Sequence, residues 1–261
     1  MKENNVHDEM QQSVEEIEKS CEEEFPLPPM VYDAIEKYMK KNRFLMLFAP
    51  PLEALEQIEN LILEQENEMW CLDFELIANL MDKIITVEMI PEHVEDNIEY
   101  YIGKIINDPM YKLHVPLIKE AYEAYKSGFY KLCVFPLISI FDHVFSLWCE
   151  GKVKLNSISI DEKPNIFKLY TKVKPEKYEN AEEEYFARIF THSVIRMYKK
   201  LFLSIPNELS KELNRNSIMH GFYDYESINK IDVLKLFQLL KSAMVLRIAD
   251  SSQLIQLQNN K

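Results

Sequence analysis

The stretch "LIKEAYEAYKSGFYKLCVFPLISIFDHVF", from Leu117 to Phe145, decides the fold class. Ser127–Gly128 divides it into two helix-length segments, of which the second is longer, strongly apolar and ended by Gly151. Its most apolar part, Leu132–Phe141, has ten residues, whereas a membrane-spanning helix needs about 20. The sequence therefore predicts a pair of helices whose second member is buried in a protein core and kinked at Pro136.

The composition of the whole chain indicates an all-α protein. Only 4 of the 261 residues are glycine, and the chain is 47% hydrophobic and 28% charged, as is ordinary for a globular protein. Scarce glycine disfavours tight turns and β-bulges, while the abundant Leu, Glu, Lys, Ile and Met favour helices. Apolar periodicity and proline breaks predict the helices Met30–Lys41, Leu52–Gln65, Phe74–Ile85, Val94–Ile106, Pro116–Lys126, Phe129–Glu150, Ile166–Tyr170, Ala181–Phe202, Pro206–Gly221 and Ile228–Ile248.

Composition along the chain predicts four regions. Residues 1–25 form an acidic, flexible N-terminal tail, and residues 251–261 form a polar C-terminal tail. Between them we expect a helical N-terminal region of unknown role, residues 26–108, and a helical domain, residues 109–250.

Charge is divided unevenly between the two halves of the chain. The net charge is −13, but residues 1–110 contain 8 basic and 26 acidic residues, whereas residues 111–261 contain 22 basic and 17 acidic residues. A basic half within an acidic chain is compatible with a phosphate-binding C-terminal half.

The predicted location is the cytoplasm, without membrane attachment. The N-terminal "MKENNVHDEM" lacks the apolar segment of a signal peptide. The four cysteines, Cys21, Cys71, Cys133 and Cys149, form no CxxC pair and no spacing typical of metal ligands. We therefore expect reduced thiols and predict no metal and no cofactor.

The stretch "NRNSIMHG", Asn214–Gly221, combines three groups that can act together on a phosphodiester. Asn216 and His220 are four residues apart and share a helix face, and the long side chain of Arg215 can reach the same place. Arg215 can bind a phosphate and stabilise a transition state, and His220 can transfer protons near neutral pH. Such a set suffices for metal-free RNA cleavage by the ribose 2′-OH. The alternative is an ordinary helix C-terminus, in which Arg215 and His220 complement the helix dipole and Gly221 is the cap.

The chain resembles HEPN domains of the abortive-infection and toxin type. The similarity lies in "NRNSIMHG" and in the helix pair of Leu117–Phe145, which carries an acidic residue, Asp142, near its end, and it covers residues 110–250 or so. The resemblance implies a bundle of four or five helices that dimerises, with the motifs of both protomers lining one cleft. It also implies Arg215 and His220 as catalytic residues, Asn216 as their polar helper and Asp142 as a supporting residue.

The predicted function is therefore a metal-independent endoribonuclease of a toxin or phage-defence system. Its predicted partners are an RNA substrate, a second copy of the chain and an antitoxin or other defence protein. Tyr223 and Tyr225 either stack on an unpaired base or pack within the bundle. Asp142 lies in an apolar helix and needs a partner, either Arg215 or a hydroxyl group.

Two alternatives remain open at this stage. The first is a HEPN module that only dimerises or binds a partner. The second, less supported by the sequence, is a helical regulator that binds DNA or protein. Geometry distinguishes the first from a nuclease, because catalysis requires Arg215 and His220 to reach solvent in a cleft, whereas a structural role predicts that both are buried and fully bonded.

Overall fold

The computed structural model of the protein describes residues 52–178, 185–252 and 254. The predicted tail 1–25, the predicted helix Met30–Lys41, the start of the predicted helix at Ala181 and residues 255–261 lie outside the described residues. The α-helices are α3 Leu52–Asn67, α4 Phe74–Met81, α5 Ile90–Asp96, α6 Ile98–Asn107, α7 Val115–Lys126, α8 Tyr130–Cys149, α9 Leu169–Lys172, α10 Tyr185–Leu201, α11 Arg215–Met219 and α12 Lys230–Ser242. The 3-10 helices are η1 Val87–Met89, η2 Pro109–His114, η3 Pro175–Lys177, η4 Tyr225–Ser227 and η5 Ala243–Arg247.

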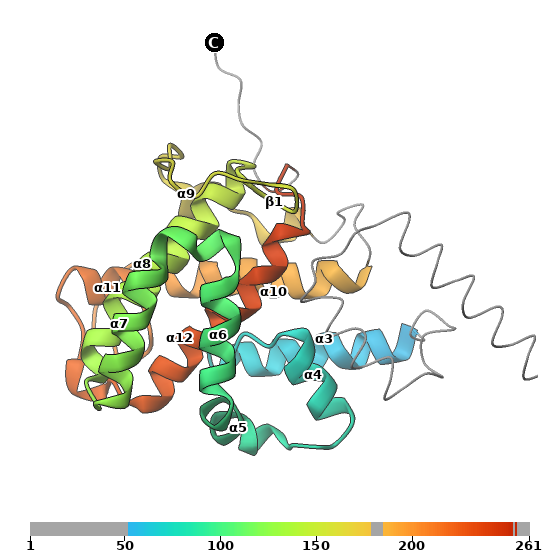
Figure 1. Ribbon diagram of the computed structural model, residues 1–261, viewed down its shortest axis with the longest axis horizontal. Coiled ribbons are helices and arrows are strands. Elements are labelled where there is room, and N and C mark those ends of the chain that lie inside the picture. The colour runs from blue at the N-terminus through green and yellow to red at the C-terminus, as the bar shows by residue number, and fades with distance from the viewer. Residues whose placement is uncertain (1–51, 179–184, 253, 255–261) are drawn as a thin grey trace, which may run out of the picture. The chain divides into compact units, whose positions relative to one another are not determined.

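The all-α prediction is confirmed for the described part of the chain. Its strands are β1 Val153–Lys154 and β2 Ser157–Ile158, which pair antiparallel in a small hairpin. The described residues belong to one compact unit. In Figure 1, α7 and α8 lie side by side as an antiparallel pair joined at Gly128, which adopts a φ of +77° that favours glycine.

α8 is the central core helix that its apolar sequence predicts. Eleven of its residues are buried, and Trp148 near its end donates a hydrogen bond to the carbonyl of Ala249 at 3.0 Å. Burying a side chain of this size contributes about 1.5–3 kcal/mol. Among the described helices, α8 is the one that is long and apolar enough to cross a membrane, and 67% of its most apolar window is buried inside the protein.

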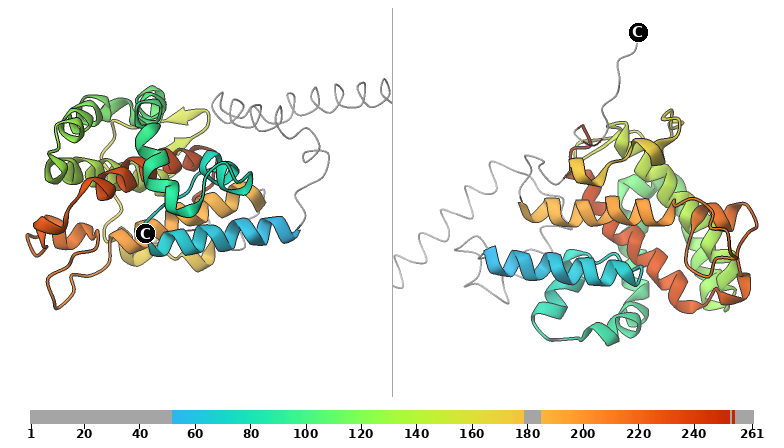
Figure 2. Two further views of the ribbon diagram at one scale, coloured as in Figure 1. Left: turned by 90° about the horizontal axis from the view of Figure 1, so that it is seen from below. Right: turned by 180° about the vertical axis from the view of Figure 1, so that it is seen from behind.

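The helices before residue 108 share this core with those after it. α12 packs against α5, α6 and α8, and α3 lies beside α10 (Figure 2). The ammonium group of Lys241 on α12 is buried and forms ion pairs with Asp73, which caps α4, and with Glu75. A separate role for residues 26–108 stays a prediction, but the described part of that region is packed into the same unit.

Four predicted helices differ from the structure. α4 ends at Met81, four residues before the predicted end at Ile85, and α9 covers Leu169–Lys172 instead of the predicted Ile166–Tyr170. The predicted helix Val94–Ile106 is interrupted at Asn97, where α5 ends and α6 begins, because the Asn97 side chain donates to the carbonyl of His93 and competes with the helix backbone. The predicted helix Pro206–Gly221 is wrong over its first half, since α11 begins only at Arg215. The backbone of Ser210 instead pairs with the segment around Tyr223, and its carbonyl accepts from the amide of Asp224 at 2.9 Å.

Candidate functional site

α11 carries the three residues of the predicted site on a helix of five residues. Asn214 caps it, because its side-chain oxygen accepts from the backbone amide of Ser217 at 2.8 Å. Arg215 is the first helical residue, and His220 is the C-cap, followed by Gly221 at a φ of +75°. Arg215 therefore lies at the positive end of the helix, where a cation is not favoured by the dipole. The interpretation of Arg215 as a C-terminal charge that complements the dipole is wrong.

Asp142 on α8 is the partner of Arg215. The guanidinium Nη2 lies 3.6 Å from the Asp142 carboxylate, and about a third of each side chain is exposed, 32% and 30%. The prediction that Asp142 needs a partner is thus confirmed, and the partner is Arg215. Burial raises the pKa of Asp142, and the charges of Arg215 and His143 offset part of that effect. The pair joins α11 to the middle of the core helix.

The rest of the Arg215 side chain is held by its neighbours but keeps hydrogen-bond donors to spare. Its Nη1 donates to the Asn216 side-chain oxygen at 3.2 Å, and its guanidinium carbon lies 5.6 Å from the centre of the Phe202 ring. A guanidinium has five N–H donors, and among the described residues the four on Nη1 and Nη2 meet only Asn216 and Asp142, whereas Nε is buried and out of reach of a ligand. Arg215 is therefore oriented by protein contacts that leave it able to bind an anion.

The side-chain amide of Asn216 is fully used in hydrogen bonds within the protein. Its nitrogen donates to the carbonyls of Phe202 and Leu203 at 3.1 and 2.9 Å, and its oxygen accepts from Arg215. These bonds fix α11 to the end of α10. In the structure Asn216 is a residue that positions Arg215.

His220 differs from its neighbours because its imidazole ring forms no hydrogen bond with any described residue. The residue is exposed, and no described residue bonds its imidazole, while its backbone amide donates to the carbonyl of Asn216 at 3.0 Å. Arg215 and His220 both reach solvent, and neither is buried and fully bonded as a structural role predicts. The cleft that catalysis also requires stays a prediction, because the pocket beside α11 is lined by neither residue.

Tyr223 contacts the segment that leads into α11, and Tyr225 contacts α11 itself. Tyr223 is only 3% exposed and donates to the carbonyl of Lys211 at 2.9 Å. Tyr225 donates to the carbonyl of Ile218 at 2.7 Å and stacks on Phe135 of α8 at a ring distance of 6.2 Å. Of the two alternatives, packing describes the Tyr223 ring, which has no open face for a base.

Sequence reasoning missed a histidine pair beside Asp142. Nε2 of His114 and Nδ1 of His143 are hydrogen bonded at 2.9 Å. The pKa of His114 is lowered to about 4, mainly by burial and to a smaller extent by the charge of His143. The two residues are 29 positions apart, and no local pattern relates them. Within the described ranges, no three His, Cys, Asp or Glu side chains are grouped so that they could hold a metal ion.

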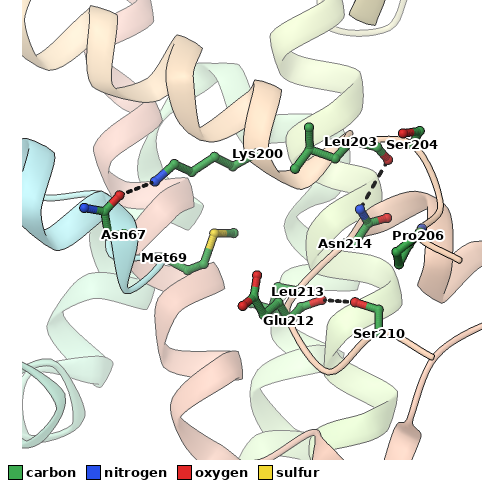
Figure 3. A pocket seen from close by; sticks show the side chains of 10 residues that line it. All are labelled: Asn67, Met69, Lys200, Leu203, Ser204, Pro206, Ser210, Glu212, Leu213 and Asn214. Atoms are coloured by element: carbon green, nitrogen blue, oxygen red, sulfur yellow. Dashed lines mark hydrogen bonds between the residues drawn. The ribbon is translucent and has the colours of Figure 1, made fainter. Parts of the chain in front are cut away.

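A pocket of about 300 Å³ adjoins the cap of α11. Figure 3 shows the ten residues that line it, Asn67, Met69, Lys200, Leu203, Ser204, Pro206, Ser210, Glu212, Leu213 and Asn214. Asn214 bonds the carbonyl of Leu203 at 3.2 Å, and Lys200 bonds the side chain of Asn67 at the same distance. The pocket lies between the ends of α3 and α10 and the segment that leads into α11. No sequence signal indicated it, because the predicted helix at Pro206 would have removed it.

Comparisons with known proteins do not assign the chain to a family. Comparison with models of protein families, with curated proteins and with solved structures finds no match. The resemblance to HEPN domains rests on the residues of α7, α8 and α11, and membership of that family stays a prediction.

Proposed function

We propose that the protein is a metal-independent endoribonuclease of the HEPN type, acting in the cytoplasm as part of a toxin or phage-defence system. The observation that carries the proposal is one short helix with two complementary groups at its ends. Arg215 is fixed by Asp142 and Asn216 yet remains partly exposed, and His220 is exposed with a free ring. Cation, orienting carboxylate and proton carrier are the groups that phosphodiester cleavage by an internal hydroxyl needs.

In the proposed reaction His220 removes the proton from a ribose 2′-OH as that oxygen attacks the adjacent phosphorus. The bond from phosphorus to the 5′ oxygen of the next nucleotide breaks, and this oxygen receives a proton. The products are a 2′,3′-cyclic phosphate and a 5′-hydroxyl, and no water is consumed in this step. Arg215 binds the non-bridging oxygens and stabilises the charge that builds up on them.

The active form in this proposal is a homodimer, because one histidine per site supplies one of the two proton transfers and His220 of the partner subunit supplies the other. Several large apolar side chains are exposed: Phe129 by 60% and Leu132 by 64% at the start of α8, and Phe222 by 39% just after α11. Covering them would favour association of two chains or docking of an antitoxin. The same exposed side chains support the second candidate, a HEPN module that binds a partner without catalysis.

The test is cleavage of end-labelled tRNA and single-stranded RNA by the purified protein in EDTA. His220→Ala and Arg215→Ala should each lower the rate by at least about 100-fold, the lower limit for loss of an acid–base group. Arg215→Lys should also be impaired, because a lysine keeps the charge but loses the fork of donors.

The matched control is Lys211→Ala, which removes an exposed cation close to α11 whose ammonium, among the described residues, pairs with Asp224 at 4.0 Å. It should cleave like the wild type. Absence of cleavage by folded wild-type protein would contradict the proposal and favour the binding module. Equal cleavage by wild type and both alanine variants would place the chemistry elsewhere.

A further inference from the structure

A basic loop lies between the core helix and α10. We call residues 163–177, "KPNIFKLYTKVKPEK", the lysine loop; it contains five lysines and one glutamate, although the chain as a whole has a net charge of −13. It includes α9 and η3. Such a local excess of positive charge is the usual footprint of a phosphate-binding surface.

Phe167 in this loop has the most exposed large apolar side chain of the described residues, at 75%. Its apolar neighbours behave differently, since Leu169 and Val173 are buried and anchor the loop to the core. Lys168, between the exposed Phe167 and the buried Leu169, adopts the left-handed conformation, with φ 52° and ψ 47°. A residue with a side chain is strained there, and strain of this kind is concentrated at functional sites. The backbone thus directs the ring of Phe167 into solvent.

The lysines of the loop are not neutralised within the described ranges. No ion pair to Lys168, Lys172 or Lys174 is formed there, and the ammonium of Lys168 lies 5.3 Å from the centre of the Phe167 ring. Of the carboxylates before the loop, Glu162 is paired with Lys152 at 2.9 Å, and Glu150 is paired with the same lysine and accepts from the backbone amides of Asn165 and Ile166. Glu182, Glu183 and Glu184 follow in the sequence, outside the described residues. An exposed aromatic ring among free lysines matches the surfaces that bind single-stranded nucleic acid.

Two contacts connect the lysine loop to the elements that carry the Arg215 site, one just before the loop and one in its middle. Before the loop, the carbonyl of Glu162 bonds His143 at 3.3 Å, next to Asp142 on α8. Within it, the carbonyl of Tyr170 accepts from Lys199 at 2.7 Å, and the same ammonium lies 3.7 Å from the centre of the Tyr170 ring. Lys199 is on the last turn of α10, three residues before Phe202, whose ring centre lies 5.6 Å from the guanidinium carbon of Arg215.

We propose that the lysine loop is the binding surface for the RNA strand, with a base stacked on Phe167 and phosphates bound by Lys168, Lys172 and Lys174. The RNA then passes along the end of α10 toward Arg215 and His220. The inference rests on the proposed function for the identity of its ligand, but it concerns binding and needs no turnover. A single strand is the favoured form because stacking on a side chain requires an unpaired base.

The experiment measures fluorescence anisotropy of a fluorescein-labelled 20-nucleotide single-stranded RNA in EDTA. The full chain carries His220→Ala throughout, so that the probe stays intact. Phe167→Ala and Phe167→Leu should weaken binding by about tenfold, as loss of one stacked base does, whereas Phe167→Trp should bind like its parent. The leucine variant separates stacking from a general apolar contact, because it keeps an apolar side chain and loses only the ring.

The lysines are tested by the dependence of affinity on salt concentration. A triple change of Lys168, Lys172 and Lys174 to alanine should reduce the slope of log affinity against log salt by about 2, at ~0.7 for each lost phosphate contact. The matched control changes Lys112, Lys119 and Lys126, three exposed lysines on η2 and α7, and should leave the slope unchanged.

The outcomes separate this inference from the proposed nuclease. Unchanged RNA affinity in the Phe167 and lysine-loop variants overturns the inference, even if the wild type cleaves RNA. Weakened binding in those variants supports it, even if the wild type cleaves nothing. Absence of RNA binding to the parent overturns it. Competition by polyglutamate as effective as by unlabelled RNA, together with normal binding by Phe167→Leu, also overturns it and indicates an acidic protein partner.

Discussion

Lys241→Met is the substitution with the largest expected effect on stability. The Lys241 side chain is 4% exposed, its ammonium lies 2.6 Å from the Glu75 carboxylate and is also paired with Asp73, and it is 4.2 Å from the centre of the Tyr101 ring. Methionine keeps most of the buried chain but leaves two carboxylates close together without their cation. Removing one partner of a buried ion pair costs about 3–5 kcal/mol, a large part of the stability of a typical domain.

Urea denaturation of the full chain at pH 7, followed by circular dichroism, measures this cost as a shift of the midpoint at constant slope. The matched control is Lys230→Met on the same helix. Lys230 also pairs with a carboxylate, that of Glu95 at 2.6 Å, but both side chains are about 40% exposed, so its loss should change little. If both variants shift the midpoint by the same small amount, α4 is not fixed to α12 by Lys241 and the shared core across residue 108 is wrong.

Three further outcomes follow from the structure. Asn214→Ala removes the cap of α11 and should lower the free energy of unfolding by about 1 kcal/mol, and it should lower the cleavage rate by more than the roughly fivefold that this energy corresponds to. Asn214→Ser can still cap and should change neither quantity. Thermal melting measures the stability, and initial rates measure the cleavage. Burial raises the pKa of Glu75, but the charge of Lys241 and the hydrogen bonds that Glu75 accepts together lower it more, so the folded-state pKa lies below the unfolded value of 4.5. The free energy of unfolding should therefore fall as the pH falls below 4.5, and this fall should be less steep in Glu75→Gln. A slope that is the same in both proteins would count against the ion pair. His114 has a folded-state pKa of about 4 against 6.5 when unfolded, so the unfolded chain binds more protons and stability should decline from pH 6.5 toward 4; His114→Gln should flatten that decline in urea titrations, and an unchanged profile would argue against the buried histidine pair.

Local patterns predicted the parts of the fold that depend on neighbouring residues. The apolar run of α8 and the break at Gly128 predict a buried helix pair, and both are present. An unpaired carboxylate in an apolar helix predicts a partner for Asp142, and Arg215 is that partner. The predicted helix start at Pro206 was wrong, because the backbone of Ser210 pairs with that of Tyr223 and periodicity does not encode this contact.

The remaining features depend on contacts between distant parts of the chain. Lys241 meets Asp73 across 168 positions, and Glu66 binds Arg196 across 130. Each of these residues alone resembles an ordinary charge on a helix surface, and only the packed structure shows that Glu66 and Lys241 are buried. The exposure of Phe167 is of the same kind, because composition alone predicts that a phenylalanine is buried.

The central claim is that a ribose 2′-OH performs the cleavage under the control of Arg215 and His220. The most direct measurement maps the cleavage site on a substrate RNA in EDTA and then replaces the single nucleotide on its 5′ side by its 2′-deoxy analogue. The account predicts cleavage of the all-ribose RNA to a 2′,3′-cyclic phosphate and a 5′-hydroxyl, and no cleavage at the modified position. Equal cleavage of both RNAs, or a 5′-phosphate on the product, would show that another nucleophile attacks and would contradict the account.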